Sequence, residues 1–289
     1  MAMGQRIRRS DFIGFLRRPY LNDGRAAPLR VRVWLGWLGL ILLADIVVGV
    51  IGRGGMWAFG LKIPPDKAIQ HLLMHPALLP FVVLLIAPIL EELVFRAMLS
   101  TRSWMVFIGS GLFVITLARL TLAVLTRHLS NHLIYVHYLD GVAMLLPLLA
   151  GYGLIWWLAG GWIMALFRRF AGPIFWTSAV LFGLVHSFNF QAGFKPILIL
   201  LTLPQMSAGV FLGYLRVRHG LRWSIATHMA IDYPVVFGAW LVLLAKTTLG
   251  VQAAGVSGLV LALVLIGTLI YGVAGLVRGG AGAASVDVG

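Results

Sequence analysis

Three short groups of ionisable residues lie inside long apolar stretches of the sequence. They are Glu91-Glu92-Leu93-Val94-Phe95-Arg96, Phe182-Gly183-Leu184-Val185-His186 and His228-Met229-Ala230-Ile231-Asp232. Ionisable side chains in membrane segments are costly and mark functional sites. Carboxylates and imidazoles can move protons and activate water, which is the chemistry of general acid–base hydrolysis. Any one group taken alone could be a polar contact between helices, but three groups that hold both glutamates of the chain favour a shared site.

The spacing within the groups predicts which side chains act together. Residues four apart lie on one face of a helix, whereas adjacent residues point about 100° apart. Glu92 and Arg96 can therefore form an ion pair, which would keep Glu92 ionised. Glu91 points elsewhere and has no cation close in sequence, which suits a general base. His228 and Asp232 share a face.

The elements that carry these groups are expected to be membrane-spanning helices. Of the 289 residues, 60% are hydrophobic and 11% are charged, and the mean hydropathy is +0.95. A soluble domain has about half apolar and about a quarter charged residues. We expect an all-α, polytopic membrane protein, because only helices and closed barrels satisfy backbone groups in lipid and the period-2 pattern of a barrel is absent. Eight segments are candidates for spans: 33–51, 73–98, 104–126, 141–167, 173–189, 196–215, 222–245 and 254–277.

The basic residues predict the orientation of these spans. The net charge is +14. If the N-terminus is cytoplasmic, residues 1–32 carry eight Arg and the other inside segments seven, against six Lys or Arg outside. The positive-inside rule then places both termini in the cytoplasm. We divide the chain into a basic segment (1–32), a transmembrane catalytic domain (33–278) and a flexible tail (279–289). The aromatic part of the basic segment either lies on anionic headgroups or is a solvated tail, and no signal peptide is expected.

Several chemistries are excluded by what the sequence lacks. The chain has no cysteine, so disulfides, thiolate metal sites and cysteine nucleophiles are excluded. No histidine is followed by glutamate, which excludes a zincin motif, and the Gly-x-Gly-Asp motif of intramembrane aspartyl proteases is absent. The cations lie between apolar segments rather than on one face, so we expect membrane lipids as partners and no nucleic acid.

The three groups together resemble the pattern of the CPBP family, the CAAX-protease and bacteriocin-processing (Abi-type) membrane proteins. That pattern is Glu-Glu-x-x-x-Arg, then Phe-x-x-x-His, then His-x-x-x-Asn, on separate helices in this order. The resemblance covers roughly residues 75–235, and Gly213-Tyr214-Leu215-Arg216 also looks like the family's approach to its last motif. It implies a glutamate-dependent intramembrane endopeptidase of eight helices, acting on a membrane-anchored or tailed protein or peptide. The implied site residues are Glu91, Glu92, Arg96, His186, His228 and Asp232.

The resemblance also implies roles for the first two groups. Glu91 would activate the attacking water together with His186, and Glu92 with Arg96 would order that base. We expect no cofactor; a zinc ion bound by one glutamate and two histidines is the less favoured alternative. We expect the protein in a bacterial inner membrane.

The third group departs from the family pattern. His228 and residue 232 would stabilise the oxyanion, but residue 232 is Asp rather than Asn. An ionised Asp cannot donate a hydrogen bond, so Asp232 would have to be protonated, or would instead orient and charge His228.

Two segments, 104–126 and 141–167, also intervene between motif helices that usually follow one another in the family. An even number of inserted spans preserves the relative direction of the motif helices. His186 lies about 20 Å beyond Pro173, whereas His228 lies only about 9 Å beyond Arg222. We therefore expect the fifth helix to begin near Arg168 or to be displaced.

Other functions remain open at this level. The same fold could serve as a non-catalytic membrane scaffold or a bacteriocin-immunity-type protein, and intramembrane acids also occur in transporters and proton-coupled channels. Asp45 and Arg119 are expected to pair structurally between the first and third spans. Gly209-x-x-x-Gly213 is expected to allow close packing of helices rather than to form a site.

Overall fold

The computed structural model describes residues 9–21, 29–67, 81–125, 131–190 and 196–244, together with residues 70, 74 and 78 and single residues between 263 and 274. In these residues the fold is helical, as expected, and the β-pairing is confined to an isolated bridge between Asp66 and Phe190. The elements are α1 (Arg9–Arg17), α2 (Val31–Ala58), the π-helix η1 (Val82–Ile86), α5 (Ala87–Phe95), α6 (Ser103–Leu125), α7 (Asn131–Arg169), α8 (Ala171–Val185), the 3-10 helices η3 (His186–Asn189) and η4 (Pro196–Leu198), α9 (Ile199–His219) and α10 (Leu221–Leu244).

Helices long and apolar enough to cross a membrane account for much of this fold. Among the described residues, four segments meet that criterion: Val31–Ala58, Leu148–Arg169, Ala171–Asn189 and Pro196–His219. Seven of the eight expected spans coincide with described helices, although the second is described as continuous helix only over residues 81–95. Most of 254–277 and all of 279–289 lie outside the described residues. The helical membrane fold is confirmed, while the count of eight spans stays a prediction.

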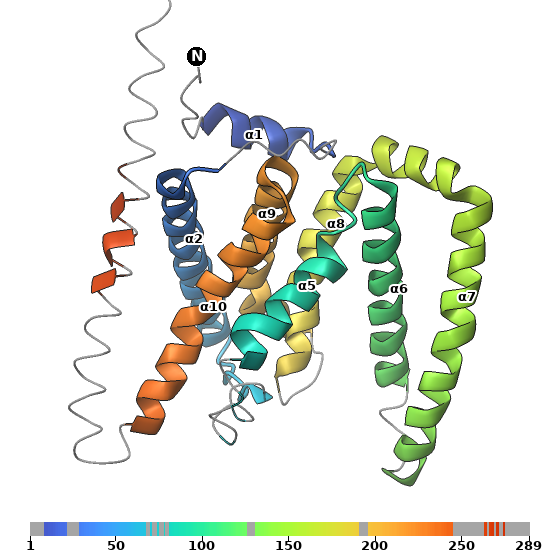
Figure 1. Cartoon of the computed structure of the whole chain (residues 1–289). Coiled ribbons are helices and arrows are strands. Elements are labelled where there is room, and N and C mark those ends of the chain that lie inside the picture. Colours follow the sequence, from blue (N-terminus) through green and yellow to red (C-terminus); the bar gives the residue numbers. More distant parts are fainter. Residues whose placement is uncertain are drawn as a thin grey trace, which may run out of the picture.

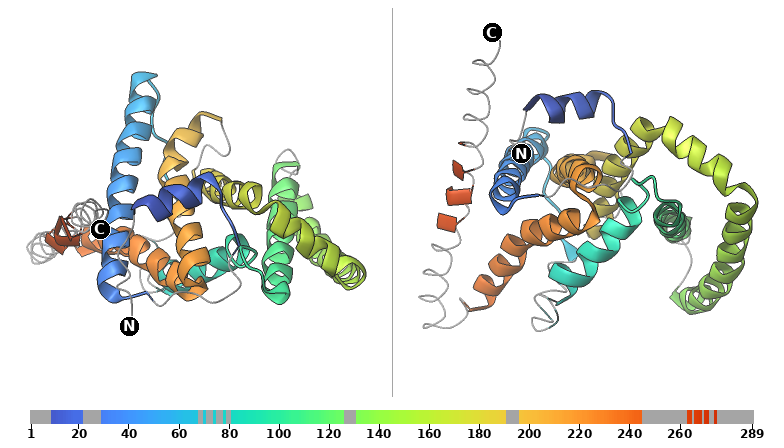
Figure 2. Two further views of the ribbon diagram at one scale, coloured as in Figure 1. Left: turned by 90° about the horizontal axis from the view of Figure 1, so that it is seen from above. Right: turned by 45° about the horizontal axis from the view of Figure 1, so that its top comes forward.

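Helix α9 lies at the centre of the bundle. It packs between α2 on one side and α8 on the other, and α10 crosses it (Figures 1 and 2). Helix α5 is inserted between α8 and α10. The three helices that carry the motif groups, α5, α8 and α10, are therefore neighbours although they are far apart in sequence.

Glycines allow α9 to approach its neighbours closely. A Cβ added to Gly209 would lie 2.8 Å from the carbonyl oxygen of Ala179 on α8, and one added to Gly213 would lie 2.7 Å from the Phe175 ring. Real Cβ atoms essentially never come closer than 3.0 Å to such atoms, so only glycine fits. The expected packing role of these two glycines is confirmed.

The inserted helices α6 and α7 lie outside this bundle. They form an antiparallel pair that contacts α5 and α8, on the side of the molecule away from α2 (Figure 1). The expected pair of Asp45 with Arg119 is therefore wrong. Asp45 lies on α2, whereas Arg119 is exposed on α6 across the bundle, and the described residues contain no ion pair between them.

Helix α1 lies across one end of the bundle (Figure 1). Phe12 packs against Trp37 and Phe211 with ring centroids 5.3 and 5.1 Å apart, and Phe15 packs edge-on against Phe175 at 5.0 Å. These aromatic side chains face the protein, so the alternative of a solvated tail is wrong for them. Contact of the basic segment with lipid headgroups stays a prediction.

Candidate active site

The last turns of α5 bring the two glutamates into the bundle. The helix begins directly after the π-helical turn Val82–Ile86, an irregularity that is frequent at functional sites. It ends at Phe95, and the amide of the capping residue Arg96 donates to the Glu92 carbonyl. The end of α5 is fixed to two neighbouring helices, because Ser178 Oγ donates to the Phe95 carbonyl at 2.5 Å and Arg216 Nε donates to the Arg96 carbonyl at 3.1 Å.

Glu92 is the most buried acid of the site and contacts three side chains. Its Oε1 lies 3.4 Å from Arg96 Nη1 and 3.0 Å from His228 Nδ1, and its Oε2 accepts a hydrogen bond from Ser224 Oγ. Both Glu92 and Arg96 are 0% exposed. A carboxylate paired with Arg can only accept, so His228 Nδ1 carries a proton that it donates to Glu92. The expected Glu92–Arg96 pair is formed, and it also holds the His228 ring.

The Phe182 ring lies between the charged and the histidine side chains. The Arg96 guanidinium carbon is 3.8 Å from its centroid, and the His186 and His228 rings contact it edge-on at 4.9 and 5.4 Å. Both histidines therefore lie at one level of the bundle. Helix α8 begins at Ala171, directly after α7, and the side chain of His186 points back toward the preceding turn, as helical side chains do. His186 is 15 residues from the start of α8 and His228 only seven from the start of α10 at Leu221, so α8 is displaced along the bundle relative to α10, which is one of the two expected outcomes.

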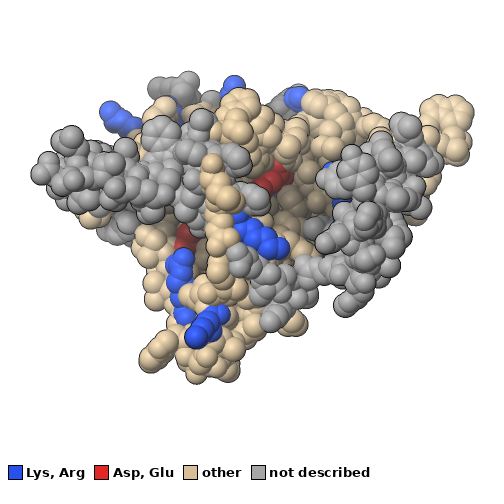
Figure 3. Space-filling model, turned by 90° about the horizontal axis from the view of Figure 1, so that it is seen from below, with Lys and Arg blue, Asp and Glu red and all other residues tan. Residues whose placement is uncertain are grey.

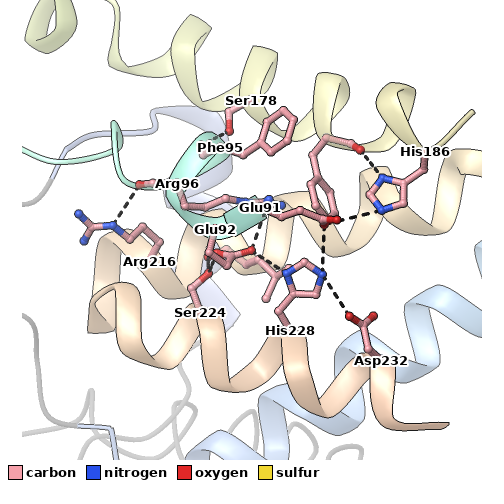
Figure 4. A network of polar contacts seen from close by, with 12 residues as sticks. Glu91, Glu92, Phe95, Arg96, Ser178, His186, Arg216, Ser224, His228 and Asp232 are labelled. Carbon is pink, nitrogen blue, oxygen red and sulfur yellow. Dashed lines mark hydrogen bonds and ion pairs between the residues drawn. The ribbon is translucent and has the colours of Figure 1, made fainter. Parts of the chain in front are cut away.

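Glu91, the other glutamate of α5, faces both histidines. Its Oε2 lies 3.8 Å from His186 Nε2 and 3.6 Å from His228 Nε2 (Figure 4). That oxygen is buried and has no hydrogen-bond partner among the described residues, while the side chain as a whole is 32% exposed. His186 Nδ1 lies 2.6 Å from the Phe182 carbonyl oxygen, which can only accept. The neutral form of His186 therefore presents the lone pair of Nε2 to Glu91.

Asp232 is at the open end of the site. Its Oδ2 is 3.7 Å from His228 Nε2, and its side chain is 26% exposed. Seen from the end of the bundle opposite α1, acidic side chains reach the surface (Figure 3). Glu92 is therefore the fully buried carboxylate of the site, whereas Glu91 and Asp232 are partly exposed to solvent.

The structure brings together all six residues singled out in the sequence (Figure 4). Ser224 was not among them. It lies one turn before His228, so Ser224, His228 and Asp232 follow one another on a single face of α10 at a spacing of four. That spacing was visible in the sequence, but a serine in an apolar helix is too common to single out without the acid that it contacts.

The described residues contain no group of three His, Asp or Glu side chains that could hold a metal ion. Glu91 and the two histidines instead face one another through a single carboxylate oxygen. The arrangement suits proton transfer between a carboxylate and imidazoles.

Residues 73–234 match the family model described as type II CAAX prenyl endopeptidase Rce1-like. The chain belongs to the Rce1-like family. The matched region is more than half of the chain and contains all six site residues, but not α1 or Asp45 on α2. No curated protein and no solved structure matches the chain.

Membership of the Rce1-like family agrees with the apolar helices. The family consists generally of membrane proteases, and its fold is that of a CAAX intramembrane protease. The chain is accordingly a multi-pass membrane protein of the CPBP type, as the resemblance of its three motifs implied. The Rce1-like region begins before η1 and ends within α10, so it includes the additional α6–α7 pair.

Proposed function

We propose that the protein is an intramembrane endopeptidase that cleaves a membrane-anchored or tailed protein or peptide with a water activated by Glu91 and His186. The observation that carries the proposal is the position of one Glu91 oxygen, 3.6–3.8 Å from the Nε2 atoms of two histidines on different helices. A general base has to be within reach of the proton that it removes, directly or through one water. Glu91 Oε2, which lacks a hydrogen-bond partner among the described residues, is placed to accept that proton.

The reaction proceeds by general acid–base catalysis. The water oxygen bonds to the carbonyl carbon of the scissile peptide while its proton passes to the Glu91 and His186 pair. The tetrahedral intermediate then collapses, the C–N bond breaks, and the leaving nitrogen takes up that proton. The products are a carboxyl terminus and a free amine, and the base returns to its starting state.

His228 and Asp232 stabilise the oxyanion in this proposal. His228 carries protons on both ring nitrogens; Nδ1–H is held by Glu92 at 3.0 Å, and Nε2–H points to the space shared by Glu91 and Asp232. Donors fixed in advance where negative charge develops are usually the largest contribution to such catalysis. Glu92 and Arg96 act by positioning His228, since neither is accessible to a substrate.

The proposal includes the partners of the protein and its orientation in the membrane. The protein contacts lipids through its exposed apolar helices and binds no nucleic acid. The starts of α6 and α8 and the ends of α7 and α9 lie at the same end of the bundle as α1 (Figure 1), and these ends carry the inside cations Arg102, Arg168, Arg169, Arg216 and Arg218. This supports the proposed cytoplasmic location of both termini. The proposed membrane is the bacterial inner membrane.

The proposed reaction is independent of metal ions. The support is chemical: a carboxylate and an imidazole within reach of one water can take up and return its proton without a metal ion. Cleavage by the purified protein is expected to persist after dialysis against a chelator. Loss of cleavage that added zinc restores would contradict this part of the proposal.

The test uses the full chain reconstituted in lipid vesicles with a membrane-anchored peptide that carries a C-terminal tail, and follows the products by mass spectrometry. Glu91→Gln and His186→Ala are expected to lower cleavage by about 10²–10⁴-fold each, the usual contribution of a general base. Ser110→Ala is the control, since Ser110 contacts Tyr152 between α6 and α7 outside the site.

Three results would contradict the proposal. Undiminished cleavage by either variant rules out the assigned base. A wild-type protein that never cleaves, with a biological phenotype that survives Glu91→Gln, favours a non-catalytic scaffold or immunity protein. Ion flux that Glu91→Gln abolishes, without peptidase activity, favours a transporter.

A further inference from the structure

The active site is closed on the side of α1. The segment Phe95–Ser100, which connects α5 to the start of α6, is buried throughout, and none of its residues is more than 4% exposed. Leu99 of this segment belongs to a buried cluster with aromatic side chains of α1, α8 and α9, namely Phe15, Phe175 and Tyr214. The Phe15 ring contacts the other two rings with centroids 5.0 and 5.2 Å apart. A packed aromatic layer therefore separates the glutamates of α5 from the α1 end of the bundle.

The opposite side of the site is open. The side chains of Glu91, Asp232 and His186 are 32%, 26% and 19% exposed. Those of Glu92 and Arg96, next to the packed layer, are 0% exposed. Acidic side chains also reach the surface in the view from the end opposite α1 (Figure 3). Water and a substrate chain can thus approach the reacting groups from this end and not from the α1 end.

The course of α8 places His186 near this open end. Helix α8 begins beside α1, because a Cβ added to Gly172 would lie 3.6 Å from Pro19, two residues after α1. His186 is 15 residues beyond the start of α8, a distance of about 22 Å along the helix. Four residues further, Phe190 forms the isolated β-bridge with Asp66, in the segment that follows the far end of α2. His186 therefore lies toward the end of the bundle opposite α1.

The two ends of the bundle differ in positive charge. Among the described residues, eight exposed Arg side chains lie at the α1 end, and four exposed Lys or Arg side chains lie toward the other end. The eight are Arg17, Arg18, Arg30, Arg32, Arg102, Arg168, Arg169 and Arg222, and the four are Arg53, Lys62, Lys67 and Arg119. An excess of positive charge favours the cytoplasmic side of a membrane. The α1 end then faces the cytoplasm, and the open end of the site faces the other side.

We infer that the active site opens on the extracytoplasmic face of the membrane, and that the substrate is a membrane-anchored protein whose cleaved tail lies on that face. The inference rests on the proposed function and on the proposed cytoplasmic location of the termini. A tail on the cytoplasmic face would have to pass the aromatic layer, in which Phe15, Phe175 and Tyr214 are at most 5% exposed. Such a tail is therefore excluded as a substrate.

Labelling of introduced cysteines tests where the site opens. The chain has no cysteine, so a single introduced thiol is the only one that can react. The probe is a membrane-impermeant maleimide, applied either to bacterial spheroplasts or to inverted membrane vesicles that contain the full chain. Arg17→Cys and Lys62→Cys mark the two ends, because both side chains are exposed, and Glu91→Cys reports the site. We expect Glu91→Cys and Lys62→Cys to be labelled in spheroplasts and to lose labelling in inverted vesicles, and the reverse for Arg17→Cys.

Every other pattern of labelling overturns the inference. If Glu91→Cys is labelled from the same side as Arg17→Cys, the site opens toward α1. If Arg17→Cys is labelled in spheroplasts, the protein has the opposite orientation and the open end lies in the cytoplasm. If Glu91→Cys is labelled from neither side, the site is not open to water. Should thermal unfolding in detergent show that Glu91→Cys does not fold, Asp232→Cys replaces it with the same expected pattern.

Cleavage of two oriented peptides tests the substrate class. Both carry the same tail and the same membrane anchor, and basic residues on one or the other side of the anchor place the tail outside or inside the cell. We expect the wild-type protein to cleave the extracytoplasmic tail, leave the cytoplasmic tail intact, and lose the first activity in Glu91→Gln. Cleavage of the cytoplasmic tail overturns the inference and leaves the proposed function standing. If neither tail is cleaved while the labelling is as expected, the proposed function and the substrate class fail, whereas the direction of the opening stands.

Discussion

The guanidinium carbon of Arg96 lies 3.8 Å from the centre of the Phe182 ring. The same ring contacts His186 and His228, so one aromatic side chain packs against the buried arginine and both imidazoles. The side-chain nitrogens of Arg96 make no hydrogen bond with described residues, and the carboxylate of Glu92 and the Phe182 ring are among the groups that stabilise its charge. A cation over a desolvated ring is stabilised by about 2 kcal/mol or more.

Phe182→Leu should therefore impair both stability and activity. Loss of the ring removes the cation–π contact and the surface against which both histidines pack, and we expect unfolding to become easier by about 2–3 kcal/mol. Cleavage should fall about tenfold or more through misplaced imidazoles. Phe113→Leu is the control, because Phe113 packs edge-on against Phe95 from α6 without touching a histidine. Equal loss of cleavage in the two variants would contradict the special position of Phe182.

Removing Arg96 should expose the cost of a buried glutamate whose remaining partners are His228 and Ser224. Arg96→Met leaves Glu92 ionised and 0% exposed, and we expect a loss of about 3–5 kcal/mol in the free energy of unfolding. The double variant Arg96→Met with Glu92→Gln should recover most of that stability, since no charge remains buried alone. It should not recover cleavage, because His228 Nδ1 loses its carboxylate. Denaturant titrations in detergent measure the first effect and the peptide assay the second.

Ser224 provides a milder test of the same network. Ser224→Ala removes one hydrogen bond to Glu92, while Arg96 and His228 remain, so we expect about 1–2 kcal/mol of lost stability. Cleavage should fall severalfold, because Glu92 positions His228. Ser110→Ala removes a comparable hydroxyl from α6 and should leave cleavage unchanged. A normal rate in Ser224→Ala would show that Glu92 does not need this contact.

The sequence could predict the fold class and most members of the site for a simple physical reason. Ionisable groups are costly in lipid, so acids and histidines within apolar segments are few and their spacing of four is informative. The pair of Glu92 with Arg96 needed only one helix, and the structure forms it. The contacts of Glu91 involve residues of three helices, and spacing within one helix cannot predict which helices lie side by side. The resemblance to a known family, which has the same motifs in the same order, predicted that these residues form one site.

What could not be predicted depends on which helices become neighbours. Asp45 lies on a helix that packs against α9 and α10 and not beside α6, which carries Arg119, because the hydropathy of α2 indicates its length but not which helix lies beside it. The packing of Phe12 and Phe15 on the bundle was missed for the same reason. An aromatic stripe shows that a face is to be buried, and lipid and protein can bury it equally well.

Two neighbouring glycines of α2 should respond in opposite ways to the same substitution. Gly52→Ala would place a Cβ 2.0 Å from the Leu200 carbonyl oxygen, which is backbone and cannot move aside without shifting α9. We expect a loss of several kcal/mol, in the range of overpacked cores or beyond. Gly54→Ala meets nothing within 4 Å and should raise stability by about 0.5–1 kcal/mol, because alanine favours the helix. Unfolding of both variants in the same detergent measures the difference, and a tolerated Gly52→Ala would mean that α2 does not approach α9 this closely. Because Trp34 of α2 donates to Thr227, the residue before His228 on α10, a displaced α2 should also lower cleavage in Gly52→Ala, whereas Gly54→Ala should cleave like the wild type.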